Sequence, residues 1–257
     1  MELGLKGKVA IITGGTEGIG KATALTMARE GARVAICARG KALLDATAAE
    51  IVKAGGEALA VVADMSKAED CKRFIGEVAQ KFGRIDILVN NAGTSARGSF
   101  LELDDATWSA DIELKVFGAI RCTRLAIPHM KKQGGGRIIN ITISGAKQPG
   151  AGSMPTSVSR AAGLAITKAL SKEFAPDNIL VNTICIGKIK SGQHERRYTK
   201  DGVSADDYYA KIGRDIPLKR AGEAQEVANV IAFLASDAAS YVTGTSINLD
   251  GGISGVL

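Results

Sequence analysis

The sequence has few of the residues from which metal centres and disulfide frameworks are built. Only two histidines, His129 and His194, occur among 257 residues, and no histidine pair has the spacing of metal ligands. The four cysteines lie far apart, without CxxC spacing, and each is within or beside an apolar run. We therefore expect no zinc or other metal site, and four free, buried thiols of a protein in a reducing compartment.

Long apolar runs and dense basic patches are also lacking. No apolar stretch approaches the length of a membrane span, and the segment "MELGLKGKVAIITGG" has the pattern of neither a signal peptide nor an anchor. The net charge is +6, but the densest basic segments, "MKKQGGGR" and "HERRYTK", contain a single aromatic residue, Tyr198, and no interleaved basic and aromatic pattern. We expect a cytoplasmic protein with a small-molecule substrate and with neither nucleic acid nor membrane as a partner; a diffuse positive field favours anionic ligands.

Proline (5 residues) and aromatic residues (4%) are scarce, whereas glycine is abundant at 31 residues. This composition suits an α/β protein with aliphatic packing and many tight turns. Short β-branched runs alternate with alanine-rich amphipathic segments. The pattern predicts strands at 8–13, 33–37, 58–63, 86–90, 137–142, 179–185 and 246–249, and helices near 18–30, 40–54, 67–82, 105–132, 157–175 and 223–235.

This repeated βα unit predicts a single-domain Rossmann fold over residues 1–257: a doubly wound, parallel, seven-stranded sheet with helices on both faces. Residues 188–220 interrupt the repeat with a polar, irregular segment. Such an insertion late in a doubly wound sheet is a candidate lid or substrate loop over the carboxyl ends of the strands. The alternative is a solvated surface excursion.

The first predicted strand runs directly into a glycine-rich turn. Thr13, Gly14, Gly18, Ile19 and Gly20 form a T-G-x-x-x-G-x-G pattern that opens a helix. Glycines in this position let the backbone approach a pyrophosphate, and the helix N-terminus offers N–H groups and positive potential. Taken alone, the pattern is also compatible with a simple turn.

Three further motifs support the cofactor interpretation. "AD" at 63–64, "NNAG" at 90–93 and the terminal "LASDAASYVTGTSINLDGG" join the glycine-rich turn in a combination that resembles the short-chain dehydrogenase/reductase family from about residue 5 to residue 252. The resemblance implies a homotetramer and an NAD(P) cofactor. It also implies cofactor-binding roles for Gly14, Thr16, Gly18, Ile19, Gly20, Asp64, Met65, Asn91, Ala92, Gly93, Arg160, Gly187, Ile189 and Ser191.

The end of the second predicted strand bears on the choice of cofactor. An acidic side chain there would bind the ribose 2′-hydroxyl of NAD, but the sequence has Ala38 followed by Arg39. This favours NADP(H) over NAD(H), because a cation can bind the 2′-phosphate and no carboxylate repels it. Glu17, in the glycine-rich turn, argues against NADP(H), and Arg39 can instead be a solvated arginine at a strand end.

The family resemblance also implies a catalytic tyrosine with a lysine four residues later, a serine about 13 residues earlier and an asparagine on the preceding long helix. The corresponding positions hold Thr156, Arg160, Ile143 and Lys115, with Ser144 beside Ile143. No alignment slip explains the difference, because none of the four tyrosines, Tyr198, Tyr208, Tyr209 and Tyr241, is followed four residues later by a lysine.

These residues allow a different proton relay. A threonine hydroxyl can polarise a carbonyl but is a poor acid, and an arginine stays charged while it binds a ribose, a carboxylate or a phosphate. A buried Lys115 near Arg160 would have a lowered pKa and could act as a general acid. The candidate catalytic set is therefore Thr156, Arg160, Lys115 and Ser144. In the alternative interpretation, Lys115 extends its ammonium group into water and "PTSVSR" (155–160) is a helix start that has lost its catalytic role.

The sequence thus favours an NAD(P)-dependent oxidoreductase that transfers a hydride between nicotinamide and a carbonyl or alcohol substrate, with a non-standard relay and an anionic substrate favoured by the cations. The alternative is a catalytically silent NAD(P)-binding sensor or assembly protein of the same fold. A lyase or other non-redox enzyme that keeps the nucleotide for structural reasons is the third hypothesis.

Overall fold

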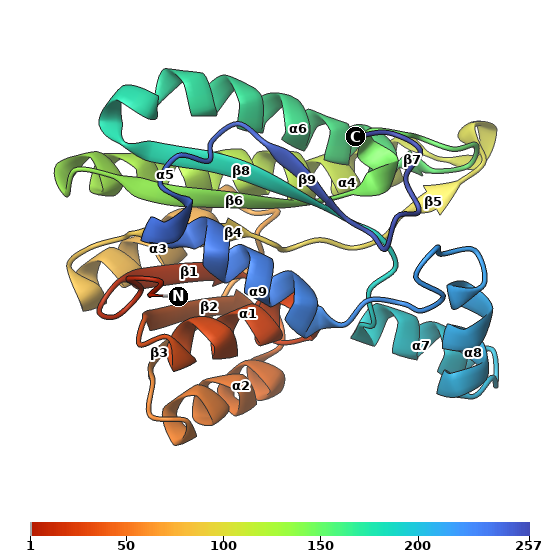
Figure 1. Cartoon of the computed structure of the whole chain (residues 1–257), viewed down its shortest axis with the longest axis horizontal. Helices are drawn as coiled ribbons and strands as arrows, with labels where there is room; N and C mark the ends of the chain where they lie inside the picture. Colours follow the sequence, from red (N-terminus) through yellow and green to blue (C-terminus); the bar gives the residue numbers. More distant parts are fainter. Residues whose placement is uncertain (1) are drawn as a thin grey trace.

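The computed structural model describes residues 2–257 and contains a seven-stranded parallel sheet (Figure 1). Neighbouring strands follow the order β3-β2-β1-β4-β6-β8-β9. The strands are β1 (Val9–Thr13), β2 (Arg33–Ala38), β3 (Glu57–Val62), β4 (Ile87–Asn90), β6 (Gly136–Ile143), β8 (Ile179–Ile186) and β9 (Ser246–Leu249). The predicted Rossmann architecture is confirmed.

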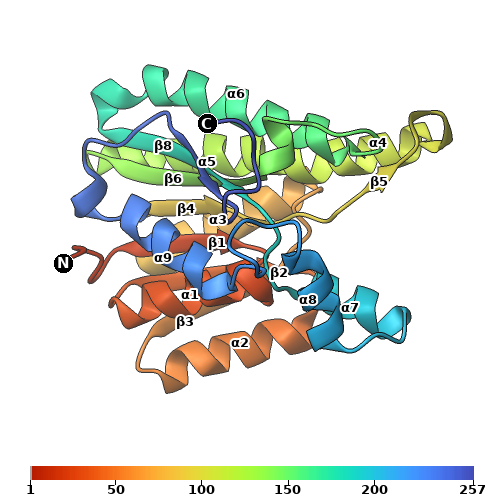
Figure 2. The same ribbon diagram turned by 45° about the vertical axis from the view of Figure 1, so that its right-hand side comes forward.

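Helices cover both faces of the sheet (Figures 1 and 2). Alternate residues of each strand point to opposite faces, so Ala10 and Ile12 of β1 belong to one buried cluster and Val9 and Ile11 to the other. The first cluster packs against α1 (Gly18–Arg29), α2 (Lys41–Lys53) and α9 (Ala224–Ala235), and the second against α3 (Ala68–Phe82) and α5 (Gly118–Lys132). On the latter side, α6 (Thr156–Glu173) packs along β6 and β8.

Most predicted elements agree with the structure within two residues, but the long helix predicted over 105–132 does not run as one regular α-helix. It consists of α4 (Asp105–Ile112), a π-helical turn (Glu113–Phe117) and α5. Single π-helical turns inside α-helices occur frequently at functional sites. Here the wide turn carries Lys115, which is buried.

The prediction that residues 188–220 are irregular is wrong. They contain α7 (Gly192–Lys200) and α8 (Ala205–Gly213), which lie beyond the carboxyl ends of the strands in both views (Figures 1 and 2). Ser204 caps α8 by accepting a hydrogen bond from the Asp207 N–H. The rings of His194, Tyr198, Tyr208 and Tyr209 pack against one another and join the two helices. Local capping and this aromatic cluster stabilise helices whose polar composition suggested a loop.

The sequence analysis also missed several short elements. An antiparallel two-stranded ladder joins β5 (Arg97–Gly98) to β7 (Met154–Pro155). Short 3-10 helices occur at Phe100–Glu102, Ser144–Ala146, Ala175–Asp177 and Asp237–Ala239. The ladder lies at the start of α6 and therefore fixes the position of Thr156.

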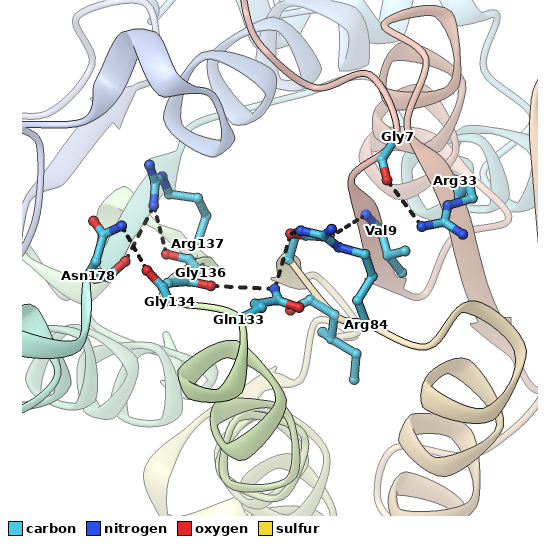
Figure 3. A network of polar contacts seen from close by, with 12 residues as sticks. Gly7, Val9, Arg33, Arg84, Gln133, Gly134, Gly136, Arg137 and Asn178 are labelled. Atoms are coloured by element: carbon cyan, nitrogen blue, oxygen red, sulfur yellow. Dashed lines mark hydrogen bonds and ion pairs between the residues drawn. The ribbon is translucent and has the colours of Figure 1, made fainter.

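A polar network closes the amino end of the sheet (Figure 3). The buried Asp86 carboxylate accepts hydrogen bonds from the Val9 N–H at 2.9 Å, from the Arg84 guanidinium at 2.6 and 2.8 Å, and from Gln133 Nε2 at 3.1 Å. Nearby, Arg137 Nη1 donates to the carbonyl of Gly136 at 3.1 Å. These contacts hold the amino ends of the central strands together, opposite to the edge where the candidate site lies.

All four cysteines are buried and unpaired. Burial raises the pKa of the Cys37 thiol to about 12, so this thiol stays protonated at neutral pH. Within residues 2–257, no helix is both long and apolar enough to cross a membrane.

Candidate functional site

A cleft of about 1200 Å³ opens at the carboxyl ends of the strands. In doubly wound sheets this edge is where ligands bind. Nearly all residues predicted to bind cofactor line the cleft, namely Gly14, Thr16, Gly18, Ile19, Arg39, Asp64, Met65, Asn91, Ala92, Gly93, Arg160, Gly187, Ile189 and Ser191. The candidate catalytic residues Thr156 and Ser144 line it as well, whereas Gly20 and Lys115 are not among its lining residues.

The glycine-rich turn has the backbone that its sequence predicted. Gly14 and Gly18 have φ angles of +68° and +50°, which side chains rarely adopt. A Cβ atom on Gly20 would collide with the carbonyl oxygen of Gly14. The turn therefore needs glycine at all three positions, because a side chain would be strained at Gly14 and Gly18 and would collide with the backbone at Gly20.

Hydrogen bonds connect this turn to the end of β4. The hydroxyl of Thr13 accepts from the backbone N–H groups of Asn91 and Ala92, each at 3.0 Å. In return, Asn91 Nδ2 donates to the carbonyls of Thr13 and Gly14 at 2.9 and 3.0 Å. The two halves of the cleft floor are thus held in one fixed arrangement.

The far end of the cleft carries the side chains that bear on cofactor choice. Arg39 is exposed and lines the cleft directly after Ala38, the last residue of β2. Glu17, which argued against NADP(H), is paired with Arg196 of α7 at 3.2 Å to both carboxylate oxygens. This ion pair offsets the negative charge of Glu17 at the cleft edge.

Lys115 lies at the centre of a buried polar group. Its Nζ donates to Thr156 Oγ1 at 2.8 Å and to a carboxylate oxygen of Asp111, one helical turn earlier. The other Asp111 oxygen accepts from the hydroxyl of Ser159 at 2.6 Å. The Lys115 side chain is fully buried, so the alternative of an ammonium group extended into water is wrong.

The pKa of Lys115 is lowered to about 8, first by burial and then by the nearby charge of Arg160, while its hydrogen bond to Asp111 opposes the shift. This ammonium group can therefore lose its proton close to neutral pH. A small cavity of about 20 Å³ between Lys115, Asn140 and Arg160 has room for one water molecule.

Thr156 joins Lys115 to the cleft. Its hydroxyl also accepts from the Ala96 N–H at 3.1 Å and donates to the Ala96 carbonyl at 2.7 Å. Its hydroxyl thus contacts the buried ammonium group, and Thr156 is itself a residue of the cleft wall. Arranged in this way, the hydroxyl can pass a proton between Lys115 and a ligand in the cleft.

Arg160, one turn further along α6, lies against the glycine of the "NNAG" motif. Its Nη1 donates to the Ile141 carbonyl at 2.5 Å, and a Cβ atom on Gly93 would run into its Nη2. Its Nε is buried without a hydrogen-bond partner among residues 2–257. Burial lowers the pKa of Arg160 to about 10, so it is charged at neutral pH and has a donor still to satisfy.

The structure brings Lys115, Thr156 and Arg160 together, and it places Ser144 on the cleft wall at the end of β6. The sequence analysis missed Asp111 and Ser159. The i, i+4 spacing of Asp111 and Lys115 was a signal that could have revealed the pair, because residues at that spacing share one helix face. Ser159 had no comparable signal.

Comparison with known proteins agrees with this geometry. A family model described as Enoyl-(Acyl carrier protein) reductase matches residues 14–254. A 3-oxoacyl-(acyl-carrier-protein) reductase from Synechocystis sp. is 39% identical over 251 residues, which are 97% of this chain and 98% of the relative. The chain belongs to the short-chain dehydrogenase/reductase family. The enzyme class predicted from the sequence, an NAD(P)(H)-dependent oxidoreductase, is confirmed at that level.

Two solved structures of the short-chain dehydrogenase/reductase fold are similar over the whole chain. L-sorbose reductase from Gluconobacter frateurii, in complex with NADPH and L-sorbose, is 35% identical, with a TM-score of 0.95 and 100% of each chain covered. An NADPH-bound short chain oxidoreductase from Pseudomonas aeruginosa PAO1, described as containing an atypical catalytic center, is 34% identical, with a TM-score of 0.93, covering 99% of this chain and 100% of that one.

Proposed function

We propose that this protein is an NADP(H)-dependent oxidoreductase that interconverts a carbonyl and an alcohol through Lys115, Thr156 and Arg160, in place of the family's tyrosine and lysine. One observation carries the proposal: the ammonium group of Lys115 donates at 2.8 Å to the hydroxyl of Thr156, a residue that lines the cleft. The NADPH-bound relative from Pseudomonas aeruginosa with an atypical catalytic centre supports it, as a similar protein in which the usual centre is also altered.

The residues of the cleft fit a dinucleotide. The Gly14–Gly20 turn offers close backbone approach for a pyrophosphate, and the guanidinium group of Arg160, which lines the cleft, can donate to a ribose hydroxyl. Arg39, with Ala38 before it, favours the 2′-phosphate of NADP(H) over NAD(H). NADPH complexes of the two similar structures support the same preference.

A bound nicotinamide would supply or accept the hydride, and residues of the chain have to move the proton. In the direction of reduction, the hydroxyl of Thr156 turns from the Ala96 carbonyl to the substrate oxygen and gives it a proton. At the same time Lys115 passes its own proton to Thr156 across the 2.8 Å hydrogen bond, so that no threonine alkoxide forms. Thr156 alone is too weak an acid for this step, whereas a lysine with a pKa of about 8 is suited to it.

Asp111 and Arg160 shift the pKa of Lys115 in opposite directions. Asp111 holds Lys115 in place and stabilises its charged form, while Arg160 and burial favour the neutral form. The outcome is an ammonium group that is mostly protonated at neutral pH but can be deprotonated during turnover. Ser144, on the wall at the end of β6, is proposed as a second hydrogen-bond donor to the substrate oxygen.

One observation favours the alternative of a silent cofactor-binding protein. The Thr156 hydroxyl is already satisfied by both backbone groups of Ala96, as it would be in a purely structural role. The alternative keeps the NADP(H) cleft and predicts binding without hydride transfer.

A binding and turnover experiment separates the two functions. Purified protein is titrated with NADPH and NADH, and the bound NADPH is then offered a panel of neutral and anionic aldehydes and ketones. We expect tighter binding of NADPH and loss of the reduced-nicotinamide absorbance with at least one carbonyl. Binding without oxidation across the panel supports the silent protein, and absence of binding overturns both proposals.

We also propose a homotetramer in which residues 188–220 form a lid over the cleft. Gln193 of α7 supports the lid, because its Nε2 donates to the Gly93 carbonyl at 3.2 Å.

The exposed side chains of Tyr241 and Leu257 are consistent with burial between the subunits of the proposed homotetramer. Light scattering on the purified protein tests the tetramer, and a dimer or monomer would contradict it.

A further inference from the structure

The charged side chains of the cleft are strongly unbalanced. Its lining includes six cationic residues, Arg39, Arg97, Arg160, Lys188, Arg196 and Arg197, but only two carboxylates, Glu17 and Asp64. Both carboxylates lie at the cofactor end, where Glu17 is paired with Arg196 and Asp64 accepts from Ser66. The cations at the opposite end therefore face the cleft without a carboxylate in its wall.

Three of these cations form a cluster at the end where the substrate would lie. Arg97 belongs to β5, whose partner in the ladder is Pro155, and it follows the residue whose backbone bonds the Thr156 hydroxyl. Lys188 comes directly after Gly187 at the end of β8, and the Gly222 N–H donates to its carbonyl at 2.9 Å. Arg197 reaches the same part of the cleft from α7.

The cluster of Arg97, Lys188 and Arg197 has no ion-pair partner among residues 2–257. Two neighbouring cations do have ion-pair partners: Lys190 pairs with Glu223 at 2.5 Å, and Arg196 pairs with Glu17 at 3.2 Å. Cations gathered in a cleft without partners repel one another and cost stability unless an anion joins them.

The pKa values of titratable groups beside the cluster are lowered, as its positive charge predicts. Burial, Arg97 and Arg197 lower the pKa of Lys188, and Arg97 also lowers that of Lys115. The pKa of His194 falls to about 4 because of burial and the cluster, so this ring is neutral at neutral pH. Its Nδ1 is 2.8 Å from the Tyr208 hydroxyl, which holds the ring in place beside the cations.

We infer that Arg97, Lys188 and Arg197 form a subsite for an oxyanion of the substrate, so that the protein acts on a carbonyl or alcohol compound carrying a carboxylate or a phosphate monoester. This inference rests on the proposed function, and it names the substrate class for the same site. The two arginines offer planar donor pairs that match an oxyanion, and Lys188 adds a partly buried point charge.

The position of the subsite explains why its occupant belongs to the substrate and not to the cofactor. Arg97 is next to the backbone that bonds Thr156, whereas the turn that fits the pyrophosphate lies at Gly14–Gly20. An anion held at the cluster would place the attached carbonyl near Thr156. The anion would also offset the positive charge that lowers the pKa of Lys115, and so favour the protonated acid in the substrate complex.

Calorimetry on the NADPH-loaded protein tests the subsite without turnover. Benzoate and phenyl phosphate are the anionic probes, and benzyl alcohol is the neutral one. We expect at least one anion to bind about tenfold or more tightly than benzyl alcohol, as a charge-assisted hydrogen bond allows. The stronger of the two anions identifies the substrate's group as carboxylate or phosphate.

Substitutions test whether the anion binds at Lys188 and Arg197. Lys188→Met and Arg197→Met should each weaken anion binding about tenfold while the Kd for NADPH changes by less than about twofold. Lys200→Met removes the same charge from an exposed position of α7 outside the cleft, and it should change neither. Equal binding of the neutral probe, or variants that weaken NADPH and not the anion, would overturn the inference.

Turnover separates failure of the subsite from failure of the proposed function. If anions bind selectively but neither 4-carboxybenzaldehyde nor benzaldehyde oxidises NADPH, the subsite stands and the proposed function fails for this class of compound. If both aldehydes react with equal kcat/KM and Lys188→Met affects them equally, the function stands and the anionic substrate class is refuted. Should NADPH not bind, the same probe comparison is made on the free protein and judged by the same criterion.

Discussion

The buried Lys115 predicts an unusual pH dependence of carbonyl reduction. Its ammonium group must be protonated to act as the acid, and its pKa is lowered to about 8. We expect kcat for reduction to be nearly constant below about pH 7 and to fall about tenfold per pH unit well above 8. The reverse reaction needs the neutral amine, so alcohol oxidation should rise through the same interval.

The assay is a pair of pH profiles, one for each direction, at saturating NADPH or NADP. An ordinary lysine would place the break near 10.4, and a structural Lys115 would produce no break at all. Lys115→Arg keeps the charge but cannot release a proton, so it should remove the break and lower kcat about 10² to 10⁴ fold. A profile unchanged by this substitution would refute the relay.

Loss of folding has to be distinguished from loss of the acid in this experiment, because Lys115 forms a buried ion pair with Asp111. Lys115→Met leaves the buried Asp111 carboxylate without its cation, which costs about 3–5 kcal/mol of folding free energy. Lys115→Met combined with Asp111→Leu removes both charges and should recover much of that loss without recovering activity. Thermal unfolding of the three variants separates a lost acid from a lost fold.

Other predictions concern the cofactor and the fold. Arg39→Ala should raise the Kd for NADPH about tenfold or more and leave that for NADH nearly unchanged, because only NADPH carries the 2′-phosphate. Gly93→Ala should leave the fold intact but weaken NADPH binding about tenfold, since the added methyl group displaces the flexible end of Arg160. Asp86→Ala should lower the free energy of unfolding by about 1–3 kcal/mol, because the buried Val9 N–H loses its acceptor.

Each of these has a matched control within the chain. Lys41→Ala removes an exposed cation two residues from Arg39, and it should affect neither coenzyme. Gly76→Ala adds a methyl group into open space on α3 and should be neutral or stabilising. Asp45→Ala removes an exposed surface carboxylate and should cost about 0–1 kcal/mol. If a control variant changed coenzyme binding or stability as much as its test variant does, the role assigned to the tested residue would be wrong.

The sequence predicted the regular part of the fold because hydrophobic periodicity decides it. Strand runs such as "KVAIIT" and alanine-rich helices alternate clearly, and the structure agrees with most of them within two residues. The sequence analysis missed α7 and α8, although Ser204 followed three residues later by Asp207 is a local signature of a helix start. The aromatic packing that joins the two helices cannot be predicted from local composition. The β5 and β7 ladder, with two residues per strand, is too short to leave a pattern.

The candidate site was predictable in its positions but not in its connections. The family motifs placed Lys115, Thr156 and Arg160 correctly in one region, since they occupy defined places on the helices. That Lys115 bonds Thr156, and that Asp111 and Ser159 complete the buried group, depends on side-chain directions around a π-helical turn. In the cluster of Arg97, Lys188 and Arg197, the last two belong to the 188–220 segment and Arg97 to the distant β5, so only the tertiary structure brings Arg97 to the other two.

A single-turnover experiment on Thr156→Val tests the central claim most directly. Valine keeps the shape of threonine but removes the hydroxyl through which Lys115 reaches the cleft. NADPH-loaded protein is mixed with the best carbonyl substrate and the reduced-nicotinamide absorbance is followed by stopped flow. We expect Thr156→Val to bind NADPH as the unmodified protein does and to transfer the hydride at least about 10² times more slowly. Equal rates in the two proteins would contradict the account.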